Sequence, residues 1–89
     1  MSESDESPLK FPCSFPIKAM GRTDTNIGTV VVTIIRKHVG DLGEGATHER
    51  LSRGGKYTSV TVTIRATSRA QLDAIYQDLS DCDDVLMAF

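Results

Sequence analysis

The first residues whose types and spacing suggest chemistry lie at positions 21–25, which read Gly-Arg-Thr-Asp-Thr. A predicted strand ends here and a predicted helix begins, so unpaired N–H groups and a partial positive charge would gather in this loop. Gly21 would allow close backbone approach, Arg22 would clamp a carboxylate, and Thr23 adds a hydroxyl. We therefore predict Gly21, Arg22 and Thr23 as a binding loop for a small carboxylate. The alternative is an ordinary turn with a solvated arginine.

The other residues that bind metals or act as nucleophiles are few and far apart. His38 falls on the apolar face of a predicted helix, near its end, where it is either packed and bonded to a carbonyl or sensitive to pH. No spacing joins His38 and His48 to carboxylates as a metal site. Cys13 and Cys82 belong to no Cys-x-x-Cys pair, so we expect reduced thiols. The sequence predicts no metal, no cofactor and no catalytic residue.

Length and composition indicate one small domain. A chain of 89 residues buries only about 60–65% of its unfolded surface, so dimerisation would add stability. No apolar run approaches the roughly 20 residues of a membrane span, and we expect a cytoplasmic protein. Residues 1–10 are acidic and poor in apolar side chains. We predict a disordered tail there and a folded domain over residues 11–89.

Charges of opposite sign lie in different parts of the chain. Residues 36–69 contain seven basic and three acidic side chains, whereas residues 73–84 contain five aspartates and no base. The net charge of −2 argues against nucleic acid as a partner. This separation either orients a partner or only marks solvated faces.

The clearest secondary-structure signal is the alternation over residues 57–66. Its apolar and polar side chains alternate with a period of two, which predicts a central strand with one buried and one open face. A first strand is expected over residues 15–20, ended by Gly21. Residues 27–39 are rich in β-branched side chains, but their apolar positions repeat with helical spacing. Burial of that face outweighs propensity, so we predict a helix.

The helix over residues 27–39 is predicted to be capped by Asp24 or Thr25 and to end at Gly40. An edge strand over residues 46–51, a second helix to Leu79 capped by Ser68, and a last strand over residues 85–89 complete the pattern.

The resulting order is β-α-β-β-α-β, an α+β fold. Right-handed crossovers make it a ferredoxin-like sandwich, a four-stranded antiparallel sheet with two helices on one face and strand order 4-1-3-2.

The helix-free face of this sheet is predicted to be a contact surface, for a second copy of the chain or for another protein. Its predicted contact residues are Met20, Thr61, Thr63, Arg65 and Leu86. Leu86 and Ala88 face this side if Val85, Met87 and Phe89 point inward. The alternative is a solvated sheet face with scattered apolar residues.

Several stretches resemble one family of small, uncharacterised bacterial proteins, the YbeD-like family. They are residues 11–21, Arg36-Lys37-His38, residues 55–64, and the aspartates before Val85 and Met87. The resemblance implies a ferredoxin-like fold similar to ACT regulatory domains, which bind amino acids and usually pair. Genes of the family often neighbour a lipoate-attachment gene, which implies a link to lipoate metabolism. No catalytic residue comes with it.

We therefore expect a non-enzymatic regulatory or interaction module that binds a small carboxylate or a partner protein. Two alternatives belong to other classes. An RNA-binding module would need stacking aromatics on the open strands, and those positions carry hydroxyls and Lys18 instead. A small hydrolase resembling acylphosphatase would need an Arg and Asn phosphate cradle, of which Met20-Gly21-Arg22 is too small a part.

Overall fold

The two longest strands lie side by side at the centre of the sheet. β1 (Cys13–Arg22) and β3 (Tyr57–Ala66) pair antiparallel over their full length, from Cys13 opposite Ala66 to Arg22 opposite Tyr57. β2 (Thr47–Leu51) joins the outer side of β3, and β4 (Met87–Ala88) joins β1, so the order is β2-β3-β1-β4. Read from the other edge of the sheet, this is the predicted order 4-1-3-2. The computed structural model describes residues 9–43 and 45–89.

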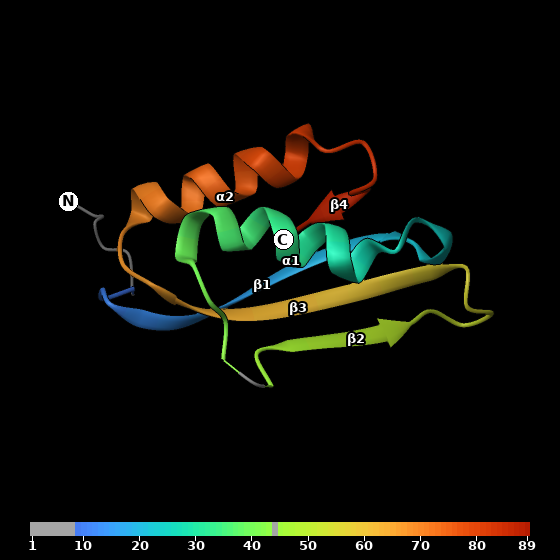
Figure 1. Ribbon diagram of the computed structural model, residues 1–89, viewed down its shortest axis with the longest axis horizontal. Coiled ribbons are helices and arrows are strands. Elements are labelled where there is room, and N and C mark those ends of the chain that lie inside the picture. The colour runs from blue at the N-terminus through green and yellow to red at the C-terminus, as the bar shows by residue number, and fades with distance from the viewer. Residues whose placement is uncertain (1–8, 44) are drawn as a thin grey trace.

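Both helices cover one face of this sheet, and the other face carries none of the described helices (Figure 1). α1 (Ile27–Val39) follows β1 after a short 3-10 turn over Thr23–Thr25, and α2 (Arg69–Asp81) follows β3. The predicted ferredoxin-like α+β fold is confirmed. Neither helix is long and apolar enough to cross a membrane.

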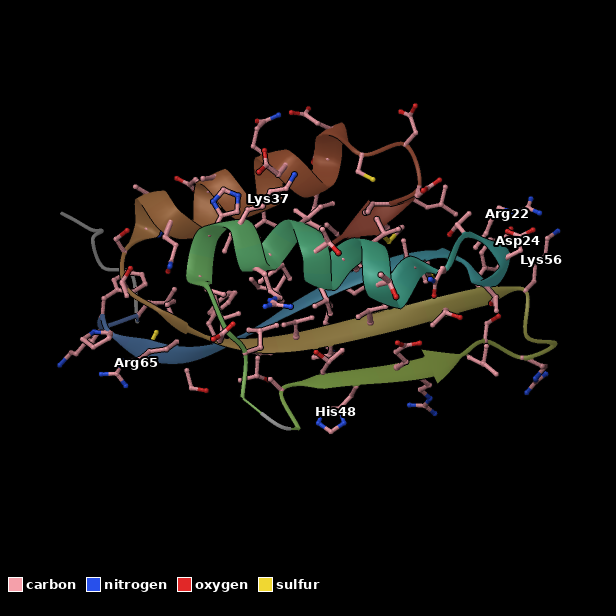
Figure 2. The ribbon with its side chains drawn as sticks, viewed as in Figure 1. Arg22, Asp24, Lys37, His48, Lys56 and Arg65 are labelled. Atoms are coloured by element: carbon pink, nitrogen blue, oxygen red, sulfur yellow. The ribbon has the colours of Figure 1, made fainter. Side chains whose placement is uncertain are left out.

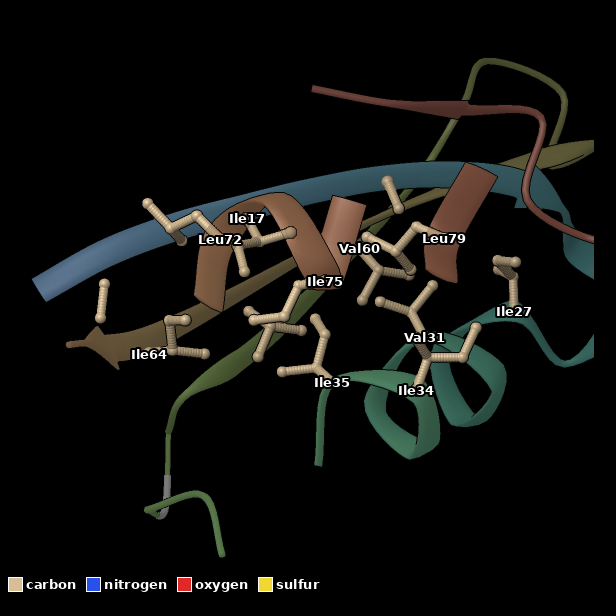
Figure 3. Packing of buried hydrophobic residues seen from close by; sticks show 13 residues of the cluster. Ile17, Ile27, Val31, Ile34, Ile35, Val60, Ile64, Leu72, Ile75 and Leu79 are labelled. Atoms are coloured by element: carbon tan, nitrogen blue, oxygen red, sulfur yellow. The ribbon is translucent and has the colours of Figure 1, made fainter. Parts of the chain in front are cut away.

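The core fills the space between the helices and the sheet (Figure 3). Val60, Val62 and Ile64 of β3 are buried, while Thr61 and Thr63 between them are not. Ile17 and Ala19 of β1 are fully buried beside them. The period of two predicted for β3 therefore separates a core face from an open face as expected.

Residues 27–39 form a helix, as their apolar periodicity predicted, and not the strand that their β-branched side chains favour. α1 buries Ile27, Val31, Ile34 and Ile35 against the sheet, as the helical spacing predicted. Gly40 ends the helix with φ of 75°, and its N–H donates to the carbonyl of Arg36.

The predicted cap of α1 is wrong. The residue before the helix is Asn26, in the left-handed region with φ of 57° and ψ of 46°. Asp24 and Thr25 belong to the 3-10 turn, where Asp24 pairs with Arg22 and the Thr25 hydroxyl donates to the Arg22 carbonyl. These side chains bond within the turn and therefore do not cap α1.

Gly21 does not end the first strand, because β1 continues through it to Arg22. A Cβ at this position would lie 2.5 Å from the carbonyl oxygen of Asp84 and 2.6 Å from Cδ1 of Ile27. Glycine is therefore required here by close packing inside the fold.

α2 begins with the predicted cap. The Ser68 hydroxyl accepts a hydrogen bond from the N–H of Gln71, and the Gln71 side chain accepts one from the N–H of Thr67. The helix runs on to Asp81, past the predicted end at Leu79.

The faces predicted for Met87, Ala88 and Phe89 are wrong, although Val85 packs against the core as predicted. Ala88 lies opposite buried Ala19 and packs against the core, whereas Met87 lies opposite Met20 on the open face. Phe89 exchanges two backbone hydrogen bonds with Lys18, of 3.0 and 2.8 Å, and is 58% exposed. Val85 also packs against the core, three residues before Ala88. An odd spacing between two core residues breaks the alternation that the prediction assumed.

Most of the predicted tail, residues 1–10, lies outside the described residues. Leu9 is described, and it packs half-buried against the core. The packed part of the chain therefore includes a residue that the sequence assigned to the tail.

Candidate functional site

The three residues predicted as a carboxylate-binding loop lie together, but each already has a contact inside the chain. Gly21 is buried beneath Ile27 and the Asp84 carbonyl. The Arg22 guanidinium binds both carboxylate oxygens of Asp24, with Nε–Oδ1 of 3.2 Å and Nη2–Oδ2 of 2.8 Å. The Thr23 hydroxyl bonds to the hydroxyl of Thr58 at 2.9 Å. An incoming carboxylate would have to compete with Asp24 for Arg22.

The pKa shifts in this loop agree with an ion pair between Arg22 and Asp24. The hydrogen bond from Arg22 holds the pKa of the Asp24 carboxyl below its usual value, and the same bond raises the pKa of Arg22. Both side chains are more than half exposed, so the pair contributes little to stability. Figure 2 shows Arg22 and Asp24 next to each other at one end of the sheet, with Lys56 nearby.

The predicted contact residues of the open face are only partly brought together. Met20, Thr61, Thr63 and Arg65 all lie on the helix-free side, because each alternates with a buried neighbour. Leu86 is 55% exposed but precedes β4, and its N–H donates to the Met20 carbonyl. Met87 occupies the position on the open face that was predicted for Leu86.

Strand register arranges the open face in rows. One row runs from His48 of β2 through Thr61 and Lys18 to Phe89, the residue after β4. The next row contains the residues at the corresponding positions two places along each strand, which are Arg50, Ser59, Met20 and Met87.

These rows form a groove along β3. The central strand contributes the small side chains Ser59 and Thr61, while the strands on either side carry longer ones. The resulting hollow has a volume of about 450 Å³. It is lined by Lys18, His48, Glu49, Arg50, Ser59, Thr61 and Phe89. We call it the open-face groove.

The charges around the open-face groove are basic and unpaired. Lys18 and Arg50 line it and Arg65 lies further along β3, and none of the three forms an ion pair with any described residue. Figure 2 shows His48 and Arg65 pointing away from the helices. Glu49 is the single acidic residue in the four strands, and its carboxylate occupies the space beside Gly28 of α1, on the helical side.

The aspartates lie on the opposite layer. The five aspartates of residues 73–84 belong to α2 and the turn after it, and most are exposed. The helical layer also carries Arg36, Lys37 and Arg69, so the charge separation in the sequence becomes only in part a separation between a basic open face and an acidic α2.

The remaining candidate residues are His38 and the two cysteines. His38 is part-buried, and its Nε2 lies 2.6 Å from Oδ2 of Asp78, which joins the end of α1 to α2. Its partner is a carboxylate and not the carbonyl predicted from the sequence. Cys13 and Cys82 are both free thiols. Over residues 9–43 and 45–89, no three His, Cys, Asp or Glu side chains come together as metal ligands.

Comparison with known proteins assigns the family. Residues 6–89 match the family described as "Protein of unknown function (DUF493)". The chain belongs to this family. A UPF0250 protein of Paraburkholderia phytofirmans is 45% identical over 80 residues, which cover 90% of each chain. The UPF0250 protein NE1487 of Nitrosomonas europaea is 42% identical over 84 residues, covering 94% of this chain and 97% of its own. The predicted YbeD-like family is confirmed.

A solved structure supports the fold alone. The solution structure of protein HP0495 from H. pylori superposes with a TM-score of 0.76 at 15% sequence identity. The match covers 100% of this chain and 94% of the other.

Sequence reasoning missed four residues of the groove, His48, Arg50, Glu49 and Phe89. The two basic residues alternate along a strand that was recognised as an edge, and this alternation was the signal that they share a face. Phe89 had no such signal, since residues 85–89 are all apolar and fix no register.

Proposed function

We propose that this protein is a non-enzymatic binding module, with a regulatory role resembling that of ACT domains, which contacts a partner protein through its open sheet face. The observation that carries this proposal is the open-face groove, where the unpaired cations Lys18 and Arg50 flank two hydroxyl side chains on the helix-free face of the sheet. Exposed Met87 and Phe89 extend the same face with apolar surface. Phenylalanine, methionine and arginine are enriched at protein contact surfaces.

A partner of opposite charge fits this face better than a second copy meeting it face to face. In such a dimer, Lys18, Arg50 and Arg65 of one chain would oppose the same residues of the other, and like charges across an interface cost free energy. Self-association through this face therefore remains the alternative. Binding of a small carboxylate at residues 21–23 also remains a proposal, in competition with Asp24 for Arg22.

The experiment is site-specific photo-crosslinking in the native cell. A photoreactive phenylalanine analogue replaces Thr63, exposed on the open face, or Asp73, exposed on α2, as the matched control. We expect a discrete adduct with another protein from position 63 and none from position 73. Mass spectrometry of the adduct names the partner and tests the link to lipoate metabolism.

Equal adducts from both positions, or adducts from position 73 alone, would refute the open face as the contact surface. An adduct with twice the mass of the chain would identify a second copy instead.

A further inference from the structure

We infer that the open-face groove binds an extended acidic segment of the partner protein, with carboxylates at alternate positions. This inference rests on the proposed function, because it names the chemistry of the partner that the open face would contact. The groove is the observation on which it depends.

The width of the groove fits one extended chain. Its walls stand on β1 and β2, which lie on either side of β3. Neighbouring strands are about 4.8 Å apart, so the walls are separated by roughly 10 Å at their bases. The small side chains of Ser59 and Thr61 leave the space between them open.

The spacing of the cations matches the repeat of an extended peptide. Arg50 belongs to the row of Ser59, and Lys18 belongs to the row of Thr61, two residues along β3. Side chains two residues apart on a strand are separated by about 6.7 Å. An extended ligand therefore presents carboxylates at positions i and i+2 to successive rows.

The floor of the groove offers hydrogen-bond donors. The hydroxyls of Ser59 and Thr61 form no side-chain hydrogen bond with a described residue, although both residues are half-buried. Each hydroxyl is a donor and an acceptor, and so suits the carboxylates and the backbone of a peptide. Phe89 and Met87, 58% and 51% exposed, lie at the β4 side and fit an apolar side chain of the same segment.

Single-stranded RNA fits the same positive charge less well. Base stacking requires aromatic rings at the central positions of the open face. Those positions hold Lys18, Ser59 and Thr61, and Phe89 lies on the side of the sheet where β4 is the edge strand. The groove therefore lacks a central stacking platform, and RNA becomes an outcome that the experiment must separate.

The test is a titration of the full-length, isotope-labelled protein, followed by NMR. The probe is a synthetic peptide of alternating glutamate and threonine with one leucine. The comparison ligands are the same peptide with glutamine in place of glutamate, and poly(U) RNA. We expect amide shifts on β1, β2 and β3 around the groove with the glutamate peptide, and weaker binding as salt is raised.

Charge-reversal variants locate the site. Lys18→Glu combined with Arg50→Glu should weaken binding of the glutamate peptide at least about tenfold, since two attractive pairs become repulsive. Lys37→Glu combined with Arg69→Glu makes the same change in net charge at exposed positions of the helices. This control should change the affinity by less than about twofold, because screened charges on the far layer act weakly. Circular dichroism confirms that each variant is folded, and the Lys18→Gln, Arg50→Gln variant replaces the first one if it is not.

Several results would overturn the inference. Equal losses in both double variants would show an effect of net charge alone, and equal binding of the glutamine peptide would exclude carboxylate recognition. Tighter binding of poly(U) would assign the groove to RNA. Binding that appears only after deletion of residues 1–8 would make the chain's own acidic segment the occupant. Failure of the peptide to bind, with adducts still formed at position 63, would refute this inference and leave the proposed function standing.

Discussion

Replacing Gly21 by alanine tests whether this glycine serves packing inside the fold. The added Cβ would lie 2.5 Å from the backbone oxygen of Asp84, where ordinary contacts begin at 3.4 Å. The segment before β4 would have to move by about 0.9 Å, the difference between those two distances. It would also have to move away from Ile27, whose Cγ1 and Cδ1 lie 2.8 and 2.6 Å from the same point.

The expected cost follows from overpacking of a close-packed site. Forcing a methyl group into such a site typically destabilises a protein by about 1–3 kcal/mol. For a domain of this size, about 2 kcal/mol lowers Tm by roughly 8–16 °C. Gly43→Ala is the matched control, because a Cβ there meets nothing within 4 Å and its φ is not positive. That change should leave stability unchanged or raise it by about 0.4–1 kcal/mol.

The assay is thermal and urea unfolding of the wild type and both variants, followed by circular dichroism. A Gly21→Ala protein as stable as the wild type would refute the reasoning, since the Asp84 carbonyl could then yield freely. In that case the predicted role of Gly21 in the binding loop, to let a ligand approach the backbone, would again be open to test.

Two further predictions concern the sheet faces and the turn before α1. Val62→Ala should lower the free energy of unfolding by about 1–4 kcal/mol, because Val62 is fully buried. Thr63→Ala on the open face should lower it far less. Equal losses of the two variants in urea unfolding would contradict the assigned faces. The depressed pKa of Asp24 makes the folded state more stable above the unfolded pKa of about 3.9, and that contribution is lost as pH falls through the lower folded value. NMR titration of the carboxyl should therefore show a pKa below the usual value in the wild type and a return toward it in Arg22→Gln; an unchanged pKa in the variant would exclude Arg22 as the cause.

The sequence predicted those elements in which a repeating pattern determined which side chains are buried. β3 alternates clearly enough to give both its bounds and its faces, and α1 has an apolar stripe that outweighs its β-branched composition. Features set by single contacts were not predictable in the same way. The cap of α1 depends on where the Asp24 and Thr25 side chains bond, and the role of Gly21 depends on a carbonyl 63 positions later in the chain.

The candidate site shows the same limit. Lys18 and Arg65 could be assigned to the open face from the alternation of their own strands. The groove, however, arises from a difference in side-chain size between neighbouring strands, so it depends on which residues stand opposite each other. Register places His48 opposite Thr61 and Phe89 beside Lys18. The uniformly apolar residues 85–89 contain no information about that register.

The distribution of charge also bears on which kind of assembly the proposed contact surface would allow. Two copies meeting through their open faces would bring Lys18, Arg50 and Arg65 against the same residues of the other chain, which opposes association. Two copies meeting through the basic face of one and the acidic α2 layer of the other would attract. Such a head-to-tail contact leaves one basic and one acidic face unused at the two ends of the pair. Further copies therefore add to an open chain of subunits, unless the rotation between neighbouring subunits closes a ring. A different protein with an acidic segment, as proposed, would instead pair with the basic face and end the assembly. The unpaired cations of the open face therefore support the proposal that the partner is a different protein and not a second copy.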